Sequence, residues 1–239
     1  RDRLRSRGLG DVYKRQTVES DRFSELSNMF AQAGNLERAL EYALRCADIE
    51  KQVAGKEHIW YGNSTIIIGN LYYALGDSIN AEENYLINKN ICKHTYGEYS
   101  ERYVDALLSL ASVNTDFSMK DGLDKATRYL DEAYSIAHKR YPLLEAQIVN
   151  QQSVIAFRNK NYEQAKTLMM QALSLCELAE GKTSNNYEIL LSNTIDLYQM
   201  FGQYDEAITL GQDFLEACNQ ANRSDSIPAF IMVKISQAN

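Results

Sequence analysis

The chain has 239 residues, of which 45% are hydrophobic and 24% are charged, a composition typical of one large or two small globular domains. It contains only two prolines, Pro142 and Pro228, which disfavours an all-β fold rich in turns and favours long helices. No apolar run approaches the ~18 residues that a transmembrane helix needs, so we expect neither a membrane anchor nor a membrane partner.

The first sixteen residues, RDRLRSRGLGDVYKRQ, carry six basic and two acidic side chains and show no apolar periodicity. Basic segments of this kind occur in transit peptides and in arms that bind nucleic acid. Residues 7–16, however, resemble the in-frame translation of a sequencing adapter, so we interpret residues 1–16 as a non-native, disordered leader. Without it, the 25 basic and 32 acidic residues become 19 and 30, a net charge of −11 that argues against a nucleic-acid partner.

An internal repeat of about 42 residues runs through the rest of the chain. Five alanines recur in a similar local context at spacings of 42, 45, 39 and 42 residues: Ala39, Ala81, Ala126, Ala165 and Ala207. Two series of glycines fall on a 42-residue grid: Gly34, Gly76 and Gly202, and then Gly55, Gly97 and Gly181. The alanines and both glycine series recur together, which indicates tandem copies of one structural unit.

Each repeat predicts a pair of helices, and the chain is therefore predicted to be all-α. The first helix of each pair has apolar or small residues at i, i+3, i+4 and i+7, one face of a helix. The glycines are predicted to end the helices in the left-handed conformation. A column of small residues is predicted where paired helices approach closely: Ser27, Gly69, Ala111 and Ser153, broken by Ile195. The predicted array covers residues 17–239, with units at about 20–58, 59–100, 101–142, 143–184 and 185–225 and a truncated unit at 226–239, as expected for a fragment.

The helix pairs, the small column and the alanines resemble tetratricopeptide repeats (TPRs). The length of 42 residues, where about 34 is usual, resembles the kinesin-light-chain subtype. Gly55-Lys56-Glu57-His58 matches the linker of that subtype, although Ile59 replaces its proline. The resemblance implies a right-handed α-solenoid of stacked helix-turn-helix repeats. Bacterial arrays of this kind often form the front part of larger proteins, including caspase-like CHAT proteases.

The residues that usually carry chemistry are isolated in this chain. Cys92, Cys176 and Cys218 share one column of the second helix, about 10 Å apart between neighbouring repeats and too far for a disulfide, so we expect free core cysteines and a reducing, cytoplasmic location. No phosphate loop, nucleophile elbow or metal-ligand spacing is present. We therefore expect no catalytic residue, no metal, no cofactor and no small-molecule substrate, and we do not expect an enzyme.

The surface that the TPR resemblance assigns to function is the concave groove lined by the first helices. Carried over position by position, the groove residues are Asn28, Asn63, Asn70, Tyr73, Ser112, Thr115, Asn150, Gln151, Phe157, Arg158, Asn193 and Asp196. Asparagine offers both a donor and an acceptor to a peptide backbone, and Tyr73 and Phe157 are predicted apolar anchors. The alternative is that these residues form only the polar lining of a solenoid.

The predicted partner is a protein or peptide that is basic or neutral. The groove positions include Asp21, Glu25, Asp105, Asp116 and Asp196 against the single Arg158, and the body of the chain is acidic. Two functions remain open. The first is a protein-interaction scaffold that binds a peptide or a partner helix in its groove. The second is a regulatory or sensor arm of a larger protein, such as a CHAT-type protease or a transcriptional or kinase regulator.

Overall fold

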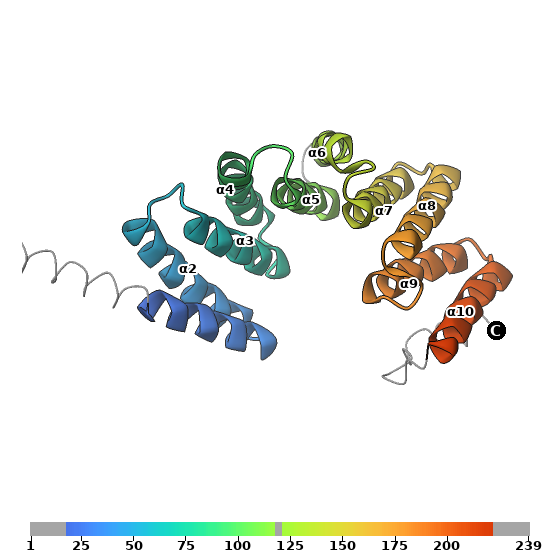
Figure 1. Cartoon of the computed structure of the whole chain (residues 1–239), viewed down its shortest axis with the longest axis horizontal. Helices are drawn as coiled ribbons and strands as arrows, with labels where there is room; N and C mark the ends of the chain where they lie inside the picture. Colours follow the sequence, from blue (N-terminus) through green and yellow to red (C-terminus); the bar gives the residue numbers. More distant parts are fainter. Residues whose placement is uncertain (1–17, 118–120, 222–239) are drawn as a thin grey trace, which may run out of the picture. The chain divides into compact units, whose positions relative to one another are not determined.

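The structure, a computed structural model, describes residues 18–117 and 121–221 (Figure 1). The predicted leader, residues 1–16, and the truncated unit, residues 226–239, lie outside the described residues. The chain forms two compact units, Arg1–Ala126 and Thr127–Asn239, and the boundary between them falls inside a helix. We refer to them as unit 1 and unit 2 and describe each by itself.

The described residues form helices joined by short turns, and they contain no strand. Residues 18–32 form the first helix, and the others follow in chain order: α2 (Leu36–Val53), α3 (Ile59–Ala74), α4 (Ser78–Tyr96), α5 (Glu101–Asp116), α6 (Gly122–Ala137), α7 (Pro142–Arg158), α8 (Tyr162–Glu180), α9 (Asn185–Met200) and α10 (Tyr204–Gln220). The predicted all-α fold of tandem helix-turn-helix repeats is confirmed.

Within each unit, helices pack against their neighbours in sequence. In unit 1, α2 contacts α3, α3 contacts α4, and α4 contacts α5. In unit 2, α7 contacts α8, α8 contacts α9, and α9 contacts α10. Packing between sequence neighbours is the defining property of repeat proteins, because each repeat buries its apolar face only against the next one.

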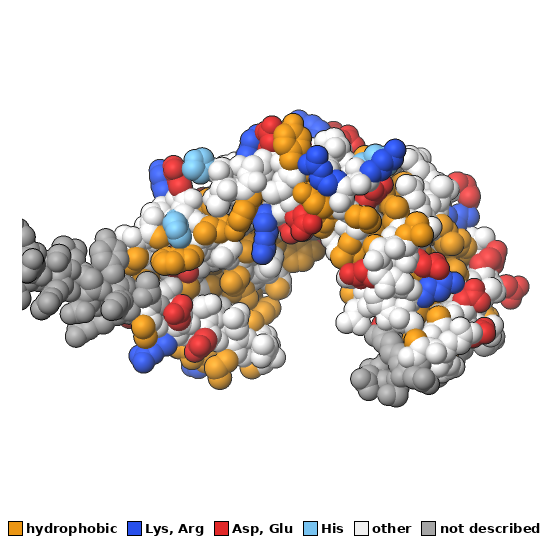
Figure 2. Space-filling view, viewed as in Figure 1, with side chains coloured by type: hydrophobic (Ala, Val, Ile, Leu, Met, Phe, Trp, Pro, Cys, Tyr) orange, Lys and Arg blue, Asp and Glu red, His pale blue; other side chains and the backbone are white. Residues whose placement is uncertain are grey.

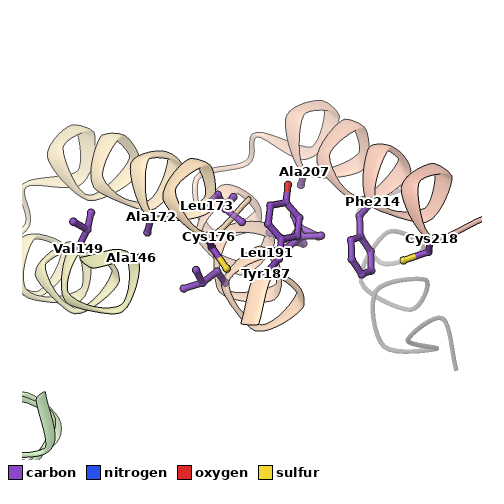
Figure 3. Packing of buried hydrophobic residues seen from close by; sticks show 12 residues of the cluster. Ala146, Val149, Ala172, Leu173, Cys176, Tyr187, Leu191, Ala207, Phe214 and Cys218 are labelled. Atoms are coloured by element: carbon purple, nitrogen blue, oxygen red, sulfur yellow. The ribbon is translucent and has the colours of Figure 1, made fainter. Parts of the chain in front are cut away.

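The core of unit 2 shows how the helix pairs bury their apolar faces (Figure 3). Tyr187 of α9 and Phe214 of α10 stack with their ring centroids 6.1 Å apart, and Phe214 is only 1% exposed. Leu173 and Cys176 reach the same cluster from α8. The large rings fill the space between the two helices of one pair, whereas the repeated alanine of α10, Ala207, lets α9 approach closely.

The column of small residues lies in the core, as its spacing predicts. Ser27, Gly69, Ala111 and Ser153 are all buried, and so is Ile195, which takes the same place in α9. A Cβ atom added to Gly69 would lie 2.5 Å from Cε1 of Tyr85 in α4. Glycine at this position therefore makes room for the Tyr85 ring between α3 and α4.

The helix ends use a few recurring residues. The six glycines of the two series have positive φ angles, from 68° at Gly202 to 98° at Gly55, so the predicted left-handed conformation is confirmed. On the same 42-residue grid, two repeats carry lysine instead: Lys139 has φ 59° and Lys160 has φ 63°. A residue with a Cβ is strained in this region, so these two turns are less favourable than their glycine counterparts.

The residues that precede the first helices also recur on the 42-residue grid, and this recurrence was not predicted. His58 is the N-cap residue of α3, and its Nδ1 accepts a hydrogen bond from the Trp60 backbone N–H at 3.2 Å. Ser100 and Ser184 occupy the corresponding places before α5 and α9, and each caps its helix with its hydroxyl. The histidine of the Gly-x-x-His linker is thus explained locally as a helix cap.

Candidate functional site

The predicted groove residues of unit 1 differ in how accessible they are. Asn28, Asn63 and Asn70 are exposed, and Tyr73 and Ser112 are half-buried. Thr115 is only 5% exposed, and its hydroxyl donates a hydrogen bond to the Ala111 carbonyl oxygen at 2.8 Å. Because its hydroxyl is used within α5, Thr115 offers nothing to a partner, and we do not retain it as a site residue.

Two of the remaining residues in unit 1 are used to join helices. The Tyr73 hydroxyl donates to the Asp116 carboxylate, and the Tyr73 ring packs edge-on against Phe117 at a centroid distance of 5.2 Å. Asn70 Oδ1 accepts a hydrogen bond of 2.8 Å from the Tyr85 hydroxyl. The side chains of Tyr73 and Asn70 therefore stabilise the packing of α3 against α5 and α4.

A cavity of about 270 Å³ opens in unit 2, between the first helices of two successive pairs, α7 and α9. It is mostly apolar, and its lining residues are Ser153, Val154, Phe157, Met169, Asn193, Asp196, Leu197 and Met200. Three predicted groove residues, Phe157, Asn193 and Asp196, are brought together here. We call it the α7–α9 cavity.

Apart from Phe157, the apolar residues that line this cavity were not predicted. Met200, at the end of α9, is 67% exposed, and Val154 and Leu197 face the same space. A signal for Val154 was present in the sequence, because it lies one 42-residue step before Asp196. Met200 carried the same signal, since its repeat position holds the predicted groove residue Arg158 one step earlier and Asp116 two steps earlier.

Phe157 is held in place by an aromatic cluster at the end of α7. Its ring centroid lies 5.6 Å from that of Tyr162 and 6.3 Å from that of Phe201. Tyr162 and Phe201 are themselves 5.0 Å apart, and the Lys166 ammonium lies 5.7 Å from the centre of the Phe201 ring. One wall of the cavity is therefore fixed before any ligand arrives, which lowers the entropic cost of binding.

The other predicted residues of unit 2 do not line this cavity. Asn150 and Gln151 are half-buried in α7, and Arg158 is exposed at its last position. Asn150 Oδ1 is buried and has no hydrogen-bond partner among the described residues.

The acidic groove positions are all on the surface. Asp21, Glu25, Asp105, Asp116 and Asp196 are exposed. Desolvation by nearby protein atoms raises the pKa of Asp105 above its ordinary value, although Arg102 acts in the opposite direction. Figure 2 shows acidic, basic and hydrophobic side chains interspersed over the visible face.

The described residues contain no group of three or more His, Cys, Asp or Glu side chains placed to hold a metal ion. Cys46, Cys92, Cys176 and Cys218 are free and buried, as predicted. Burial raises the pKa of the Cys46, Cys92 and Cys176 thiols, which disfavours the reactive thiolate. In the same part of the chain, no helix has both the length and the hydropathy of a membrane-spanning segment.

Sequence profiles of the tetratricopeptide repeat family match residues 144–220 and residues 21–59. Among curated proteins, no sequence matches this chain. Solved structures show the same fold. One of them contains kinesin light chain TPR-like repeats of Podosopora anserina that are nearly identical to one another. Its TM-score is 0.65 at 18% identity, and the match covers 86% of this chain and 98% of that one.

Two further similar structures contain bound factors. A Rap protein complexed with competence and sporulation factor has a TM-score of 0.68 at 14% identity, covering 84% of this chain and 54% of that one. NprR in complex with its cognate peptide NprX has a TM-score of 0.64 at 17% identity, covering 97% of this chain and 63% of that one. At these identities the likeness shows a shared fold.

Proposed function

Because the chain is an array of tetratricopeptide repeats of the kinesin-light-chain type, we propose that it is a protein-interaction scaffold. Its partner is a peptide or a helix of another protein, bound along the groove of the first helices. The α7–α9 cavity receives an apolar side chain of that partner. The observation that carries the proposal is this cavity, in which Phe157, Asn193 and Asp196 surround an apolar space.

The chemistry of the cavity suits one anchoring side chain of a peptide. Binding energy at protein interfaces concentrates in a few apolar anchors that fill pockets, with polar groups at the rim. Met200, Leu197 and Val154 supply the apolar surface here. Asn193, on the exposed side of α9, offers a donor and an acceptor to a peptide backbone.

The similar structures support a peptide as the ligand. Rap was solved with competence and sporulation factor, and NprR with its cognate peptide. We extend this property to the present chain because the fold is shared and the cavity is present.

The partner segment is basic or neutral next to its apolar anchor. Asp196 is exposed at the cavity, and the chain as a whole has a net charge of −7. A carboxylate beside the cavity attracts Lys or Arg and repels acidic segments.

A peptide array probed with the whole chain tests this proposal, and affinities of the strongest peptides are then measured in solution. Met200→Gln replaces an exposed apolar side chain at the cavity and should weaken binding by about tenfold, the loss expected for an anchoring contact. Leu178→Gln is the matched control, because Leu178 is 82% exposed on α8 and does not line the cavity. Equal affinity of the two variants would show that the peptide binds elsewhere.

The second candidate function is that of a regulatory arm of a larger protein. It is favoured by the coverage of Rap and NprR, since this chain matches only 54% and 63% of those chains. Sequencing the parent gene on both sides of the array tests it. A protease, kinase-regulating or DNA-binding domain in the same reading frame, before or after the array, would establish the arm, and a gene that encodes the array alone would exclude it.

A further inference from the structure

A second cavity, of about 240 Å³, lies in unit 1 and has a different chemistry. It is formed by the first helix (residues 18–32), the end of α2 and the start of α3, and its lining residues are Ser20, Asp21, Ile49, Glu50, Val53 and Trp60. Two carboxylates, two aliphatic side chains and an indole thus surround one small space. We call it the Trp60 cavity.

Glu50 is held in place by hydroxyl groups. Its Oε2 accepts a hydrogen bond of 2.6 Å from the Ser64 hydroxyl, and its Oε1 accepts one of 3.4 Å from the Ser20 hydroxyl. Ser20 and Ser64 are 6% and 5% exposed, so these donors come from the core side. Each carboxylate oxygen has a second lone pair, which leaves acceptor capacity for a ligand.

The charge of Glu50 is not balanced within the described residues. Glu50 is half-buried and forms no ion pair with any Lys, Arg or His of that part of the chain. Desolvation raises its pKa, and the nearby Asp21 charge raises it further, against the hydroxyl and thiol hydrogen bonds that lower it. A half-buried carboxylate beside a second carboxylate is costly unless a positive charge pairs with it.

Trp60 offers an apolar surface for an alkyl chain and an aromatic face for a cation. Its side chain is 45% exposed, although indole is among the largest apolar groups in proteins. The ring is braced by His58, whose ring packs edge-on at a centroid distance of 4.8 Å. Tryptophan is the aromatic side chain that attracts cations most strongly.

We propose that the Trp60 cavity binds the side chain of a lysine or arginine of a partner protein. The charged end lies against the carboxylates of Glu50 and Asp21, and the alkyl part contacts Ile49, Val53 and Trp60. The volume is below the roughly 300–1,000 Å³ of pockets that take whole small molecules, so the occupant is a single side chain. The site lies in unit 1 and does not depend on the proposed role of the α7–α9 cavity.

Trp60 is the only tryptophan of the chain, so its fluorescence reports directly on this cavity. The whole chain is titrated with Nα-acetyl-lysine amide and Nα-acetyl-arginine amide, whose side chains keep their positive charge, at constant ionic strength. N-acetyl-norleucine amide and N-acetyl-glutamine amide are the uncharged controls of similar shape. A saturable change with a basic probe, at least about tenfold tighter than with the uncharged controls, is the expected result.

Glu50→Gln keeps the shape of the side chain but removes its charge, and it should weaken binding of the basic probes by about tenfold. Asp21→Asn is a second variant at an exposed carboxylate, whose folding is not at risk. Glu83→Gln, which removes an exposed carboxylate from α4, is the matched control and should leave the titration unchanged. Circular dichroism confirms that each variant is folded.

Three outcomes would overturn the proposal. They are no saturable change with either basic probe, equal affinity for the charged and uncharged probes, or full binding by both Glu50→Gln and Asp21→Asn. If Glu50→Gln does not fold, Asp21→Asn decides the question alone. The α7–α9 variant Met200→Gln should titrate like the wild type, which separates this site from the proposed function of unit 2.

Discussion

Tyr73 and Phe117 pack edge-on with ring centroids 5.2 Å apart, and the same pairing recurs 84 residues later between Phe157 and Phe201 at 6.3 Å. In each pair, one ring lies in the last turn of the first helix of a repeat. The other ring belongs to the residue directly after the first helix of the next repeat. The intervening repeat position holds Thr115, which has no ring. Two residues predicted as ligand anchors are thus also contacts between successive repeats.

The contact between Gly69 and Tyr85 predicts a large effect of a side chain at position 69. Gly69→Leu should destabilise the protein by about 1–3 kcal/mol, because even a Cβ would lie 2.5 Å from the Tyr85 ring. Chemical denaturation measures the change. Ala74→Leu, at an exposed position of the same helix, is the control and should stay within about 0.5 kcal/mol.

A double-mutant cycle identifies the cause of that loss. In a Tyr85→Ala background the ring is absent, so Gly69→Leu should cost less than in the wild type. Equal costs in the two backgrounds would show that the Tyr85 ring is not what excludes a side chain at Gly69.

Lys160 has the left-handed backbone conformation in the turn between α7 and α8, and this conformation is predicted to lower the stability of the protein. Lys160→Gly should stabilise unit 2 by about 1 kcal/mol, because glycine adopts φ 63° without a Cβ clash. Lys160→Ala keeps the Cβ and should give no gain, which separates the backbone effect from the loss of charge. Thermal unfolding of the three proteins provides the comparison, and a gain of equal size in both variants would contradict the explanation.

The raised pKa of Glu50 predicts a specific pH dependence of stability. The folded protein holds the proton of this carboxyl more tightly than the unfolded chain, whose ordinary value is 4.5. The contribution of the carboxyl to stability is therefore complete below about pH 4.5 and is lost as the pH rises through the raised pKa. The free energy of unfolding of the wild type minus that of Glu50→Gln should fall over this window.

Denaturation of both proteins at several pH values gives this difference. Glu83→Gln again controls for the loss of one exposed carboxylate, and its difference from the wild type should fall less. A difference for Glu50→Gln that rises with pH would mean that the folded state prefers the charged form, contrary to the burial of this group.

The exposed Asp and Glu side chains at the proposed groove positions predict that binding of basic peptides depends on salt. Affinity for a Lys- or Arg-containing peptide should fall as the salt concentration rises, because salt screens the attraction between exposed charges. The Debye length is only about 8 Å at physiological ionic strength. A neutral variant of the same peptide should show a much weaker dependence. Hits dominated by acidic peptides, or by peptides captured through a free C-terminal carboxylate, would contradict this assignment.

The sequence predicted the repeat architecture because its signals are local. Helix periodicity, the glycine columns and the small column around Gly69 each depend on the geometry of one helix pair, and the structure confirms them. The accessibility of groove residues depends on the neighbouring repeats instead. Thr115 is buried, and Phe157 belongs to an aromatic cluster, through contacts that the spacing within one repeat does not encode.

The α7–α9 cavity was predicted in part for the same reason. Asn193 and Asp196 are polar residues at groove positions of one helix, so the repeat register found them. Met200 lies one 42-residue step after Arg158, a predicted groove position, whereas Met169 lines the cavity from α8 and follows no groove column.

The measurement that tests the proposed function most directly is an NMR map of the strongest array-selected peptide on the isotope-labelled chain. The chemical shifts of the backbone amides of Val154, Asn193 and Leu197 should change as peptide is added. The dissociation constant from this titration should agree with the one measured in solution. Amides on the exposed face of α8 near Leu178 should not move. Shifts confined to α8 or α10, with the α7–α9 cavity unaffected, would contradict the assignment of the cavity as the peptide-binding site.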